Sequence, residues 1–439
     1  MIQIQAIGGY NEIGRNMTAV KIDDTVIILD MGLYLPSYIK YTEDEDIRKI
    51  PIKKLVEVGA IPDDSIIDDW KKDVKMIIPT HAHLDHLGAL PFISNNYHAE
   101  IICTDYTAEL IKAICKDERI KLKNQVKSLP TNSRYKKGDV EIEFIHTTHS
   151  TPQAVMVAIH SKYGTLLYCN DFKFDSFPVL GKKPNFKRLK ELGEEGVKLL
   201  ICDSTRADDA RKTPSESVAR QMLKDLLLGI EATGKAIFVT TFSSHIARLK
   251  SIIDYAKRIN RKPILMGRSL AKYVLAAERA KIVNFSKDVE IVGFSSKIQK
   301  RLRKLEKEKE KYLFVVTGHQ GEPKAVLSKL ARGDLKFNFE KEDCVIFSCS
   351  VIPSEINIEA RHVLEEELKA RKLRIFKDIH VSGHAAREDL RDLINMVKPK
   401  NLIPAHCEKQ MADAMIELAG ECGVENVIRV NDGDRIELK

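Results

Sequence analysis

The sequence predicts an α/β protein in which a strand-rich domain is interrupted by a domain of alternating strands and helices. Short β-type runs dominate the first 200 residues, strands and helices alternate from about residue 213, and short strands return after about residue 373. We therefore expect a first domain at 1–205, an inserted domain at 206–373 and the returning part of the first domain at 374–439.

The expected elements follow from the spacing of apolar residues. In the first part, apolar runs bounded by turn residues predict strands at 2–7, 17–22, 25–29, 74–78, 140–145, 154–159, 165–169 and 198–201. In the returning part, the pattern predicts helices at 387–397 and 408–419, with strands at 401–403 and near 427–430.

Near the start of the inserted domain, the sequence Thr-Pro-Ser-Glu (213–216) predicts a capping box with proline at the first helical position. Helical apolar spacing follows. Further along, strands at 236–240, 264–266, 312–316 and 344–347 alternate with helices. This alternation predicts a mostly parallel sheet with helical crossovers.

Composition excludes several classes of protein. The chain has 439 residues, of which 44% are apolar and 31% charged, so it can bury a core and is not disordered. No apolar run approaches the ~18 residues of a membrane helix, and the start lacks a secretory-signal pattern. Eight cysteines without a C-x-x-C pair indicate free thiols in a reducing compartment. We expect a cytoplasmic protein with no membrane partner.

Four side chains of the metal-ligand type lie within six residues, directly after the apolar strand 74–78. On an extended stretch His81 and His83 project to the same side and can share one ion, while Asp85 and His86 at the following turn can reach a second. The alternative is a histidine-rich turn that merely caps the strand. Three histidines and an aspartate at this spacing favour a dinuclear metal site instead.

Further ligands are expected where other strands end, because a strand holds its last side chains rigidly. The candidates are His149, Asp171 and His406, each of which follows a predicted strand. Asp171 is the natural bridging carboxylate, since its two oxygens can face two cations. Asp30, at the end of strand 25–29, more plausibly orients a ligand histidine than binds metal itself.

These residues resemble the metallo-β-lactamase superfamily, whose H-x-H-x-D-H motif is reproduced at 81–86 with the later His, Asp and His in the same order. The resemblance implies an αβ/βα sandwich with two zinc ions at its edge, manganese being the alternative metal. It assigns one ion to His81, His83 and His149, the other to Asp85, His86 and His406, and Asp171 to both.

Three further motifs resemble the β-CASP branch of this superfamily, and ribonuclease J within it. Asp203 stands in the acidic first motif, His384 in the second (381–385) and His406 in the third. The strings TTFSS (240–244), GRSL (267–270) and TGHQGEP (317–323) support the same branch. The chain carries neither the extra C-terminal domain of many bacterial enzymes nor N-terminal KH domains, so it resembles the compact archaeal form.

The resemblance implies a zinc-dependent ribonuclease acting on single-stranded RNA. We expect a processive 5′→3′ exonuclease that prefers 5′-monophosphate ends and releases nucleoside 5′-monophosphates. His384 is the candidate for stabilising the scissile phosphate and protonating the leaving oxygen, with Asp203 holding its tautomer or sharing the proton. Asp85 completes the catalytic set. A homodimer is implied by the resemblance alone.

A pocket for the RNA 5′-phosphate is expected at the turn formed by Ser382, Gly383, His384 and Ala385. Successive backbone N–H groups could form an anion nest there, and the Ser382 hydroxyl adds a donor. The alternative is a turn that only positions His384.

Other functions remain open at this stage. An endoribonuclease of the β-CASP type would act in RNA 3′-end or precursor processing. An RNA-binding protein with a degenerate site is disfavoured by the intact ligand pattern, and a lactonase or thiolester hydrolase by the inserted domain. Residues 297–311 hold eight Lys or Arg and three Glu, which suits an RNA contact or a solvated helix face equally.

Overall fold

The computed structural model of the chain describes residues 1–42 and 50–438. It divides into two compact units. The first comprises 1–176, 182–213 and 382–439, and the second comprises 177–181 and 214–381. The sequence predicts changes of domain at 205/206 and 373/374, and the main changes of unit lie a few residues further along the chain, at 213/214 and 381/382.

The first unit contains two seven-stranded sheets. The strands of the first sheet are β20 (Arg435–Leu438), β1 (Ile2–Gly8), β2 (Met17–Ile22), β3 (Thr25–Leu29), β4 (Val74–Ile78), β5 (Glu100–Cys103) and β6 (Val126–Ser128), in that order. The pairs from β20 to β3 are antiparallel, and those from β3 to β6 are parallel.

The second sheet joins the returning part of the chain to the first part. Its strands are β19 (Asn426–Val427), β18 (Asn401–Ala405), β11 (Val197–Asp203), β10 (Gly164–Cys169), β9 (Val155–Ser161), β8 (Val140–His146) and β7 (Arg134–Lys137), in that order. Strand β18 pairs parallel with β11 and places Ala405 beside Asp203. Residues two hundred positions apart therefore meet at one end of this sheet.

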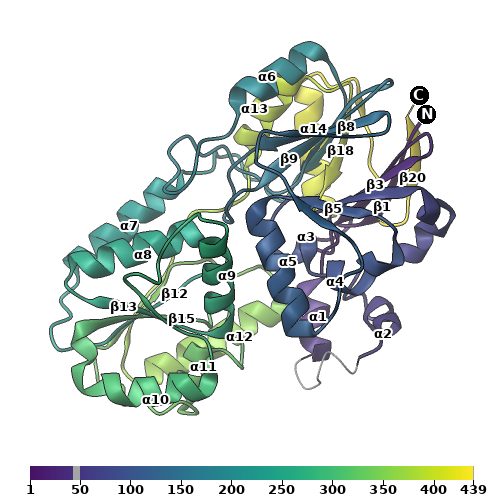
Figure 1. The fold of residues 1–439 in the computed structure, drawn as a ribbon. Helices are drawn as coiled ribbons and strands as arrows, with labels where there is room; N and C mark the ends of the chain where they lie inside the picture. The colour runs from purple at the N-terminus through teal and green to yellow at the C-terminus, as the bar shows by residue number, and fades with distance from the viewer. Residues whose placement is uncertain (43–49, 439) are drawn as a thin grey trace. The chain divides into compact units, whose positions relative to one another are not determined.

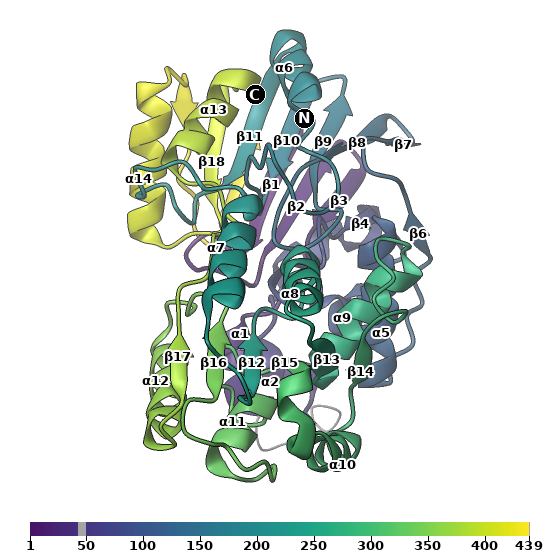
Figure 2. The ribbon, with the colours of Figure 1, turned by 90° about the vertical axis from the view of Figure 1, so that its left-hand side faces the viewer.

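Helices cover the outer face of each sheet, which gives the αβ/βα sandwich that the family resemblance implies (Figures 1 and 2). The apolar faces of α2 (Ile52–Glu57), α4 (Leu90–Ile93) and α5 (Asp105–Glu118), with the 3₁₀ helix η2 (Asp64–Asp73), pack on the first sheet. Those of α6 (Phe186–Glu195), α13 (Arg387–Val397) and α14 (Lys409–Glu421) pack on the second. The described residues of this unit also form the short helices α1 (Leu35–Thr42), α3 (Leu84–Leu87) and η3 (Ser94–Asn96).

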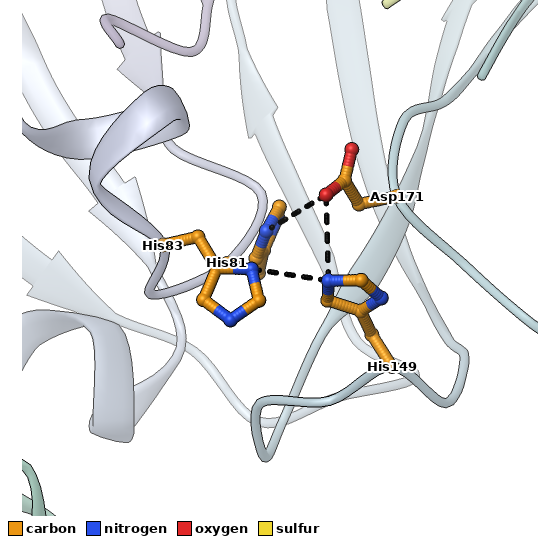
Figure 3. A group of neighbouring side chains, drawn as sticks. All are labelled: His81, His83, His149 and Asp171. Atoms are coloured by element: carbon orange, nitrogen blue, oxygen red, sulfur yellow. Dashed lines mark hydrogen bonds and ion pairs between the residues drawn. The ribbon is translucent and has the colours of Figure 1, made fainter. Parts of the chain in front are cut away.

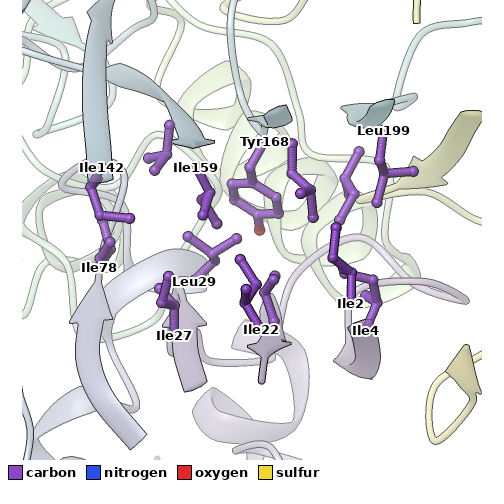
Figure 4. Packing of buried hydrophobic residues seen from close by; sticks show 14 of the residues in the cluster. Ile2, Ile4, Ile22, Ile27, Leu29, Ile78, Ile142, Ile159, Tyr168 and Leu199 are labelled. Carbon is purple, nitrogen blue, oxygen red and sulfur yellow. The ribbon is translucent and has the colours of Figure 1, made fainter. Parts of the chain in front are cut away.

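The main core lies between the two sheets, as Figure 4 shows. Alternate residues of the first sheet, such as Ile22 and Leu29, face Ile142, Tyr168 and Leu199 of the second. Because both sheets are covered on their outer faces as well, their strands are apolar on both sides, which explains the near-continuous apolar runs in the sequence. Within the described part of the chain, no helix combines the length and apolar character needed to span a membrane.

The second unit is built on one six-stranded sheet in which every strand pair is parallel. The strand order is β14 (Glu290–Val292), β13 (Lys262–Met266), β15 (Tyr312–Val316), β12 (Ile237–Thr240), β16 (Cys344–Phe347) and β17 (Arg374–Phe376). The helices are α7 (Glu216–Gly229), α8 (Ile246–Arg258), α9 (Arg268–Arg279), α10 (Ser295–Leu305), η4 (Glu306–Lys311), α11 (Val326–Arg332) and α12 (Glu355–Ala370). The predicted parallel sheet with helical crossovers is confirmed.

Helix α7 begins differently from the prediction. Ser215 is its N-cap, whereas the hydroxyl of Thr213 donates to the carbonyl oxygen of His384 at 2.7 Å. Glu216 forms an ion pair with Arg248 of α8, with 2.5 Å between Arg248 Nε and Glu216 Oε1. The predicted capping box is therefore wrong, because both of its side chains bind partners distant in the sequence.

Candidate metal centre

The loop after β4 carries four of the predicted ligands. His81 and His83 lie on its extended part, and His83 is the N-cap residue of α3, the short helix that holds Asp85 and His86. A backbone hydrogen bond from Met31 N to His86 O (2.7 Å) ties this helix to the segment after β3. The change from extended to helical backbone turns the two pairs of side chains in different directions, as the sequence predicts.

The other predicted ligands follow strands of the second sheet that run in the same direction. His149 lies after β8, Asp171 after β10 and His406 after β18, so the three meet at one edge of the sheet. Asp171 and His406 have left-handed backbone conformations, with φ of 41° and 54°. Such conformations are costly for residues other than glycine and cluster at functional sites.

The predicted ligands come together as two groups that share Asp171. Within each group, one candidate ligand atom per residue lies within 4.8 Å of all the others. The first group is His81, His83, His149 and Asp171 (Figure 3), and the second is Asp85, His86, His406 and Asp171.

Each oxygen of the Asp171 carboxylate faces a different one of the two groups. Its Oδ2 lies 3.5 Å from His81 Nε2 and 3.3 Å from His149 Nε2, as Figure 3 shows. Its Oδ1 lies 3.1 Å from His86 Nε2 and 3.5 Å from His406 Nε2. The geometry is that of a carboxylate placed to serve two neighbouring cations.

The protonation states in the first group suit metal binding. Burial lowers the pKa of His81 and His149 well below the usual range and that of His83 to about 4, so these imidazoles are neutral near pH 7. Although burial raises the pKa of Asp171, the charges of His86, His406 and His384 lower it well below the usual range. Neutral imidazoles and an ionised carboxylate are the forms that coordinate a metal.

Asp30 lies behind the centre, where the sequence analysis expects an orienting carboxylate. Its Oδ2 lies 2.9 Å from His86 Nδ1, and its Oδ1 accepts from the backbone N–H of Thr80 at 2.7 Å. The Thr80 hydroxyl donates to Asp30 and lies 3.1 Å from His81 Nδ1. These contacts leave Nε2 of both imidazoles facing Asp171.

Asn16 is a further orienting residue that the sequence analysis missed. Its Oδ1 lies 3.0 Å from His406 Nδ1, and its Nδ2 donates to the backbone oxygen of Asp85 at 3.0 Å and lies 3.2 Å from His86 Nε2. The amide of Asn16 thus contacts Asp85, His86 and His406, which are all the members of the second group other than Asp171. An asparagine in a loop after β1 carries no local signal of this role, because its partners lie far away in the sequence.

His384 and Asp203 lie together beside the first group. His384 Nδ1 is 2.9 Å from Asp203 Oδ2, and His384 Nε2 is 3.8 Å from Asp171 Oδ2. Thr205 fixes Asp203 in turn by donating its backbone N–H to Oδ1 at 2.9 Å. Burial alone lowers the pKa of His384, but Asp203 and Asp171 outweigh it and raise the pKa to about 9. Asp203 thus fixes one ring nitrogen and the other faces the centre.

The turn 382–385 does not form the predicted anion nest. The N–H of His384 is donated to Ser382 Oγ at 3.0 Å, and that of Ala385 to the carbonyl oxygen of Phe172 at 2.6 Å. None of these four residues has the left-handed backbone that a nest requires. The predicted nest is wrong, because the N–H of His384 is used within the turn and that of Ala385 is used by Phe172.

Gly383 contacts a predicted ligand directly. Its carbonyl oxygen lies 2.7 Å from His149 Nδ1, and a Cβ atom added at Gly383 would come within 2.9 Å of the imidazole. The carbonyl therefore accepts the Nδ1 proton and leaves His149 Nε2 facing Asp171. Only glycine allows this approach.

Three family models together match most of the chain, each over a separate segment. The metallo-beta-lactamase superfamily model matches residues 12–191, the model described as "Ribonuclease J, beta-CASP domain" matches 234–364, and that described as "Zn-dependent metallo-hydrolase RNA specificity domain" matches 370–429. The fold and the clustered ligands therefore define a metallo-hydrolase of the metallo-β-lactamase superfamily with an inserted β-CASP domain.

Similar proteins define the family more narrowly. Ribonuclease J of Methanocaldococcus jannaschii is 43% identical over 425 residues, covering 96% of this chain and 95% of that protein. Ribonuclease J of Pyrococcus abyssi is 41% identical over 428 residues, covering 96% and 93%. Ribonuclease J of Mycolicibacterium smegmatis is 30% identical over 446 residues, covering 100% and 75%. The chain belongs to the ribonuclease J family, and as a member it is a metal-dependent hydrolytic nuclease.

The fold also matches a solved structure of low sequence identity. A protein of unknown function from Enterococcus faecalis V583 superimposes with a TM-score of 0.69 at 18% identity, and the match covers 100% of both chains. At this identity the match concerns the fold alone.

Proposed function

We propose that this chain is a zinc-dependent ribonuclease that degrades single-stranded RNA processively from the 5′ end and releases nucleoside 5′-monophosphates. The observation that carries the proposal is the pair of ligand groups that share Asp171. RNA as the substrate is supported by the match to an RNA specificity domain and by the names of the relatives.

The residues fit a two-metal centre. His81 Nε2 and Asp171 Oδ1 are buried and have no hydrogen-bond partner among the described residues. Polar atoms left in this way are costly in a folded protein unless a ligand satisfies them. Histidine nitrogens with carboxylates are the donor set that zinc takes, and manganese also accepts it. We assign one ion to His81, His83 and His149, the other to Asp85, His86 and His406, and Asp171 to both.

The chain's own residues supply the rest of the chemistry. When bound, the metal ions would supply an activated water and positive charge for the phosphoryl oxygens. His384 Nε2, which faces the centre, binds the scissile phosphate and donates a proton to the leaving oxygen. Asp203 keeps the His384 imidazole oriented through Nδ1 and stabilises it when protonated.

A preference for 5′-monophosphate ends requires an anion contact near this centre. The Ser382 hydroxyl accepts one N–H and can still donate its own proton, so it is the proposed contact for the terminal phosphate. Gly383, His384 and Ala385 shape this turn. Holding the end at a fixed distance would place the next phosphodiester at the reacting position. Ser382→Ala should reduce the preference without metal loss, whereas a bulky residue at Gly383 should displace His149.

The test is digestion of one RNA labelled at either end and carrying a 5′-hydroxyl, monophosphate or triphosphate. We expect mononucleotides from the 5′ end and the fastest decay of the monophosphate substrate. Internal fragments would instead identify an endoribonuclease, and equal rates on all three ends would contradict the terminal-phosphate contact. Metal analysis of the purified protein distinguishes zinc from manganese, and light scattering tests the homodimer that the resemblance implies.

A further inference from the structure

The second unit carries an open basic pocket between β14 and α10 that the proposed chemistry does not use. Its cavity volume is about 320 Å³, and its lining residues are Glu290, Ile291, Val292, Lys297, Lys300, Arg301 and Lys304. The pocket thus presents four cationic side chains, one carboxylate and two apolar side chains.

The cations of this pocket come from one face of α10. Lys297, Lys300, Arg301 and Lys304 follow the i, i+3, i+4, i+7 spacing that places side chains on the same side of a helix. The adjacent face of the helix, with Ile298, Leu302 and Leu305, is buried in the core of the unit. The pocket is therefore held on a helix fixed by its own apolar stripe.

Most of this positive charge is not neutralised within the chain. Arg301 pairs with Glu290 at 2.7 Å. Lys297, Lys300 and Lys304 are exposed and make no ion pair with an acidic side chain among the described residues. By contrast, Lys309, further along the same basic stretch, is buried and binds Asp343 at 2.9 Å. The basic stretch thus separates into structural residues and a group of unpaired cations.

An exposed aromatic ring adjoins the unpaired cations. Phe294, directly before α10, is 66% exposed, and Lys297 Nζ lies 5.5 Å from the centre of its ring. The exposed flat face of Phe294 is able to stack on a nucleobase. Cations for phosphates next to an aromatic ring for a base are the combination found in proteins that bind single-stranded nucleic acid.

We propose that this pocket is an accessory binding site for single-stranded RNA, in which Lys297, Lys300 and Lys304 contact phosphates and Phe294 stacks on one base. The inference rests on the proposed function, since it takes RNA as the substrate. The site increases the affinity for RNA long enough to reach it and leaves the hydrolysis of a dinucleotide unchanged.

The test compares two double variants with the same change in net charge. K300A/K304A removes two pocket cations, whereas R303A/K307A removes two exposed cations of the same basic stretch that do not line the pocket. Affinity for a long oligouridylate is measured against salt concentration by fluorescence anisotropy, with the His384→Ala change in every protein to slow turnover during the measurement. The plot of the logarithm of the binding constant against the logarithm of the salt concentration has a negative slope. In the pocket variant this slope should be less steep by about 1.4, since each phosphate contact on a single strand contributes ~0.7.

Phe294→Ala tests the stacking contact. It should weaken binding of the single strand roughly fivefold or more, the lower end of the loss for one stacked base, and leave binding of a duplex unchanged. If K300A/K304A and R303A/K307A weaken binding equally, the pocket has no specific role and the inference fails. Absence of any RNA hydrolysis by the wild-type protein would instead overturn the proposed function.

Discussion

Each unit contains a buried polar cluster, and the two clusters differ in how completely other residues of the chain hydrogen-bond their polar atoms. In the second unit, Arg248 is fully buried, and its three nitrogens bind Glu216, the carbonyl oxygens of Ser348 and Ile379, and the Ser348 hydroxyl at 2.5–3.0 Å. In the metal centre of the first unit, His81 Nε2 and Asp171 Oδ1 keep no hydrogen-bond partner among the described residues.

The difference separates a structural cluster from a binding site. A buried charge that is fully hydrogen-bonded holds helices together, and removing one partner destabilises the fold. Buried atoms that converge without partners indicate a ligand that the chain does not provide. Variants in the metal centre should therefore lower turnover at nearly constant unfolding free energy. Variants in the Arg248 cluster should lower the unfolding free energy at nearly constant turnover.

The largest effect on turnover is expected for His83→Ala and Asp85→Ala. Each removes a proposed ligand from one of the two groups, so the loss should exceed the roughly 10- to 100-fold typical of residues that only orient ligands. RNA binding should persist, since the proposed RNA contacts at Ser382 and in the pocket of α10 lie outside the ligand groups. The measurements are RNA turnover with added metal, metal content and RNA affinity. Near-normal turnover of either variant would refute the two-metal assignment.

His384→Ala should reduce turnover by on the order of 10²-fold or more, as is typical when a positioned acid is removed. Its Nδ1 is bound to Asp203 and only its Nε2 faces the centre, so both metals should stay bound. Single-turnover kinetics together with metal analysis check this expectation. A drop in metal content would place His384 among the ligands instead.

Asn16→Ala should weaken metal binding roughly 10- to 100-fold, the usual effect of removing a partner that orients ligands. The reason is that Asn16 contacts His406, His86 and the backbone of Asp85. Titration with a chelator measures the affinity. Asn401→Ala is the matched control, because Asn401 also donates to a backbone oxygen, that of Lys198, but contacts no ligand. Equal affinity in both variants would remove Asn16 from the centre.

The sequence predicts what local patterns determine. The strands 17–22, 25–29 and 74–78 and the helix 387–397 have the predicted bounds, because their apolar periodicity is unambiguous. The predicted ligands come together because a strand end fixes the place of the next side chain. Where the sequence offers rigid elements with chemically distinctive residues at their ends, prediction succeeds.

The features that were missed depend on partners distant in the sequence. Asn16 binds His406, 390 positions away, and no local pattern indicates that contact. The predicted nest at 382–385 fails because Phe172 takes the Ala385 N–H, and the predicted capping box fails because Glu216 pairs with Arg248. In the turn and the capping box the local pattern is polar, but tertiary structure sets which partners its groups bind.

The smallest effect on turnover, and the largest on stability, is expected for Arg248→Met. Removing the guanidinium breaks one partner away from the buried carboxylate of Glu216, and breaking a buried ion pair typically costs about 3–5 kcal/mol of unfolding free energy. Thermal unfolding measures the loss, and turnover per folded molecule should stay unchanged. Lys257→Met, which breaks the exposed pair with Asp288, is the control and should change the melting temperature little.

The pH dependence of this variant sharpens the comparison. In the wild-type protein burial raises the pKa of Glu216, but His245 and Arg248 outweigh it and lower the pKa well below the ordinary value of 4.5. Its contribution to stability is therefore present above about pH 4.5 and is lost as the pH falls through the folded pKa. Without Arg248, one of the two groups that oppose burial is lost, so the pKa of Glu216 should rise above its wild-type value, and protonation of Glu216 should then reduce the destabilisation of the variant. The difference in melting temperature between the wild-type protein and Arg248→Met should be largest near neutral pH and should become smaller toward pH 4. A difference that stays constant with pH would show that Arg248 stabilises the unit through packing alone.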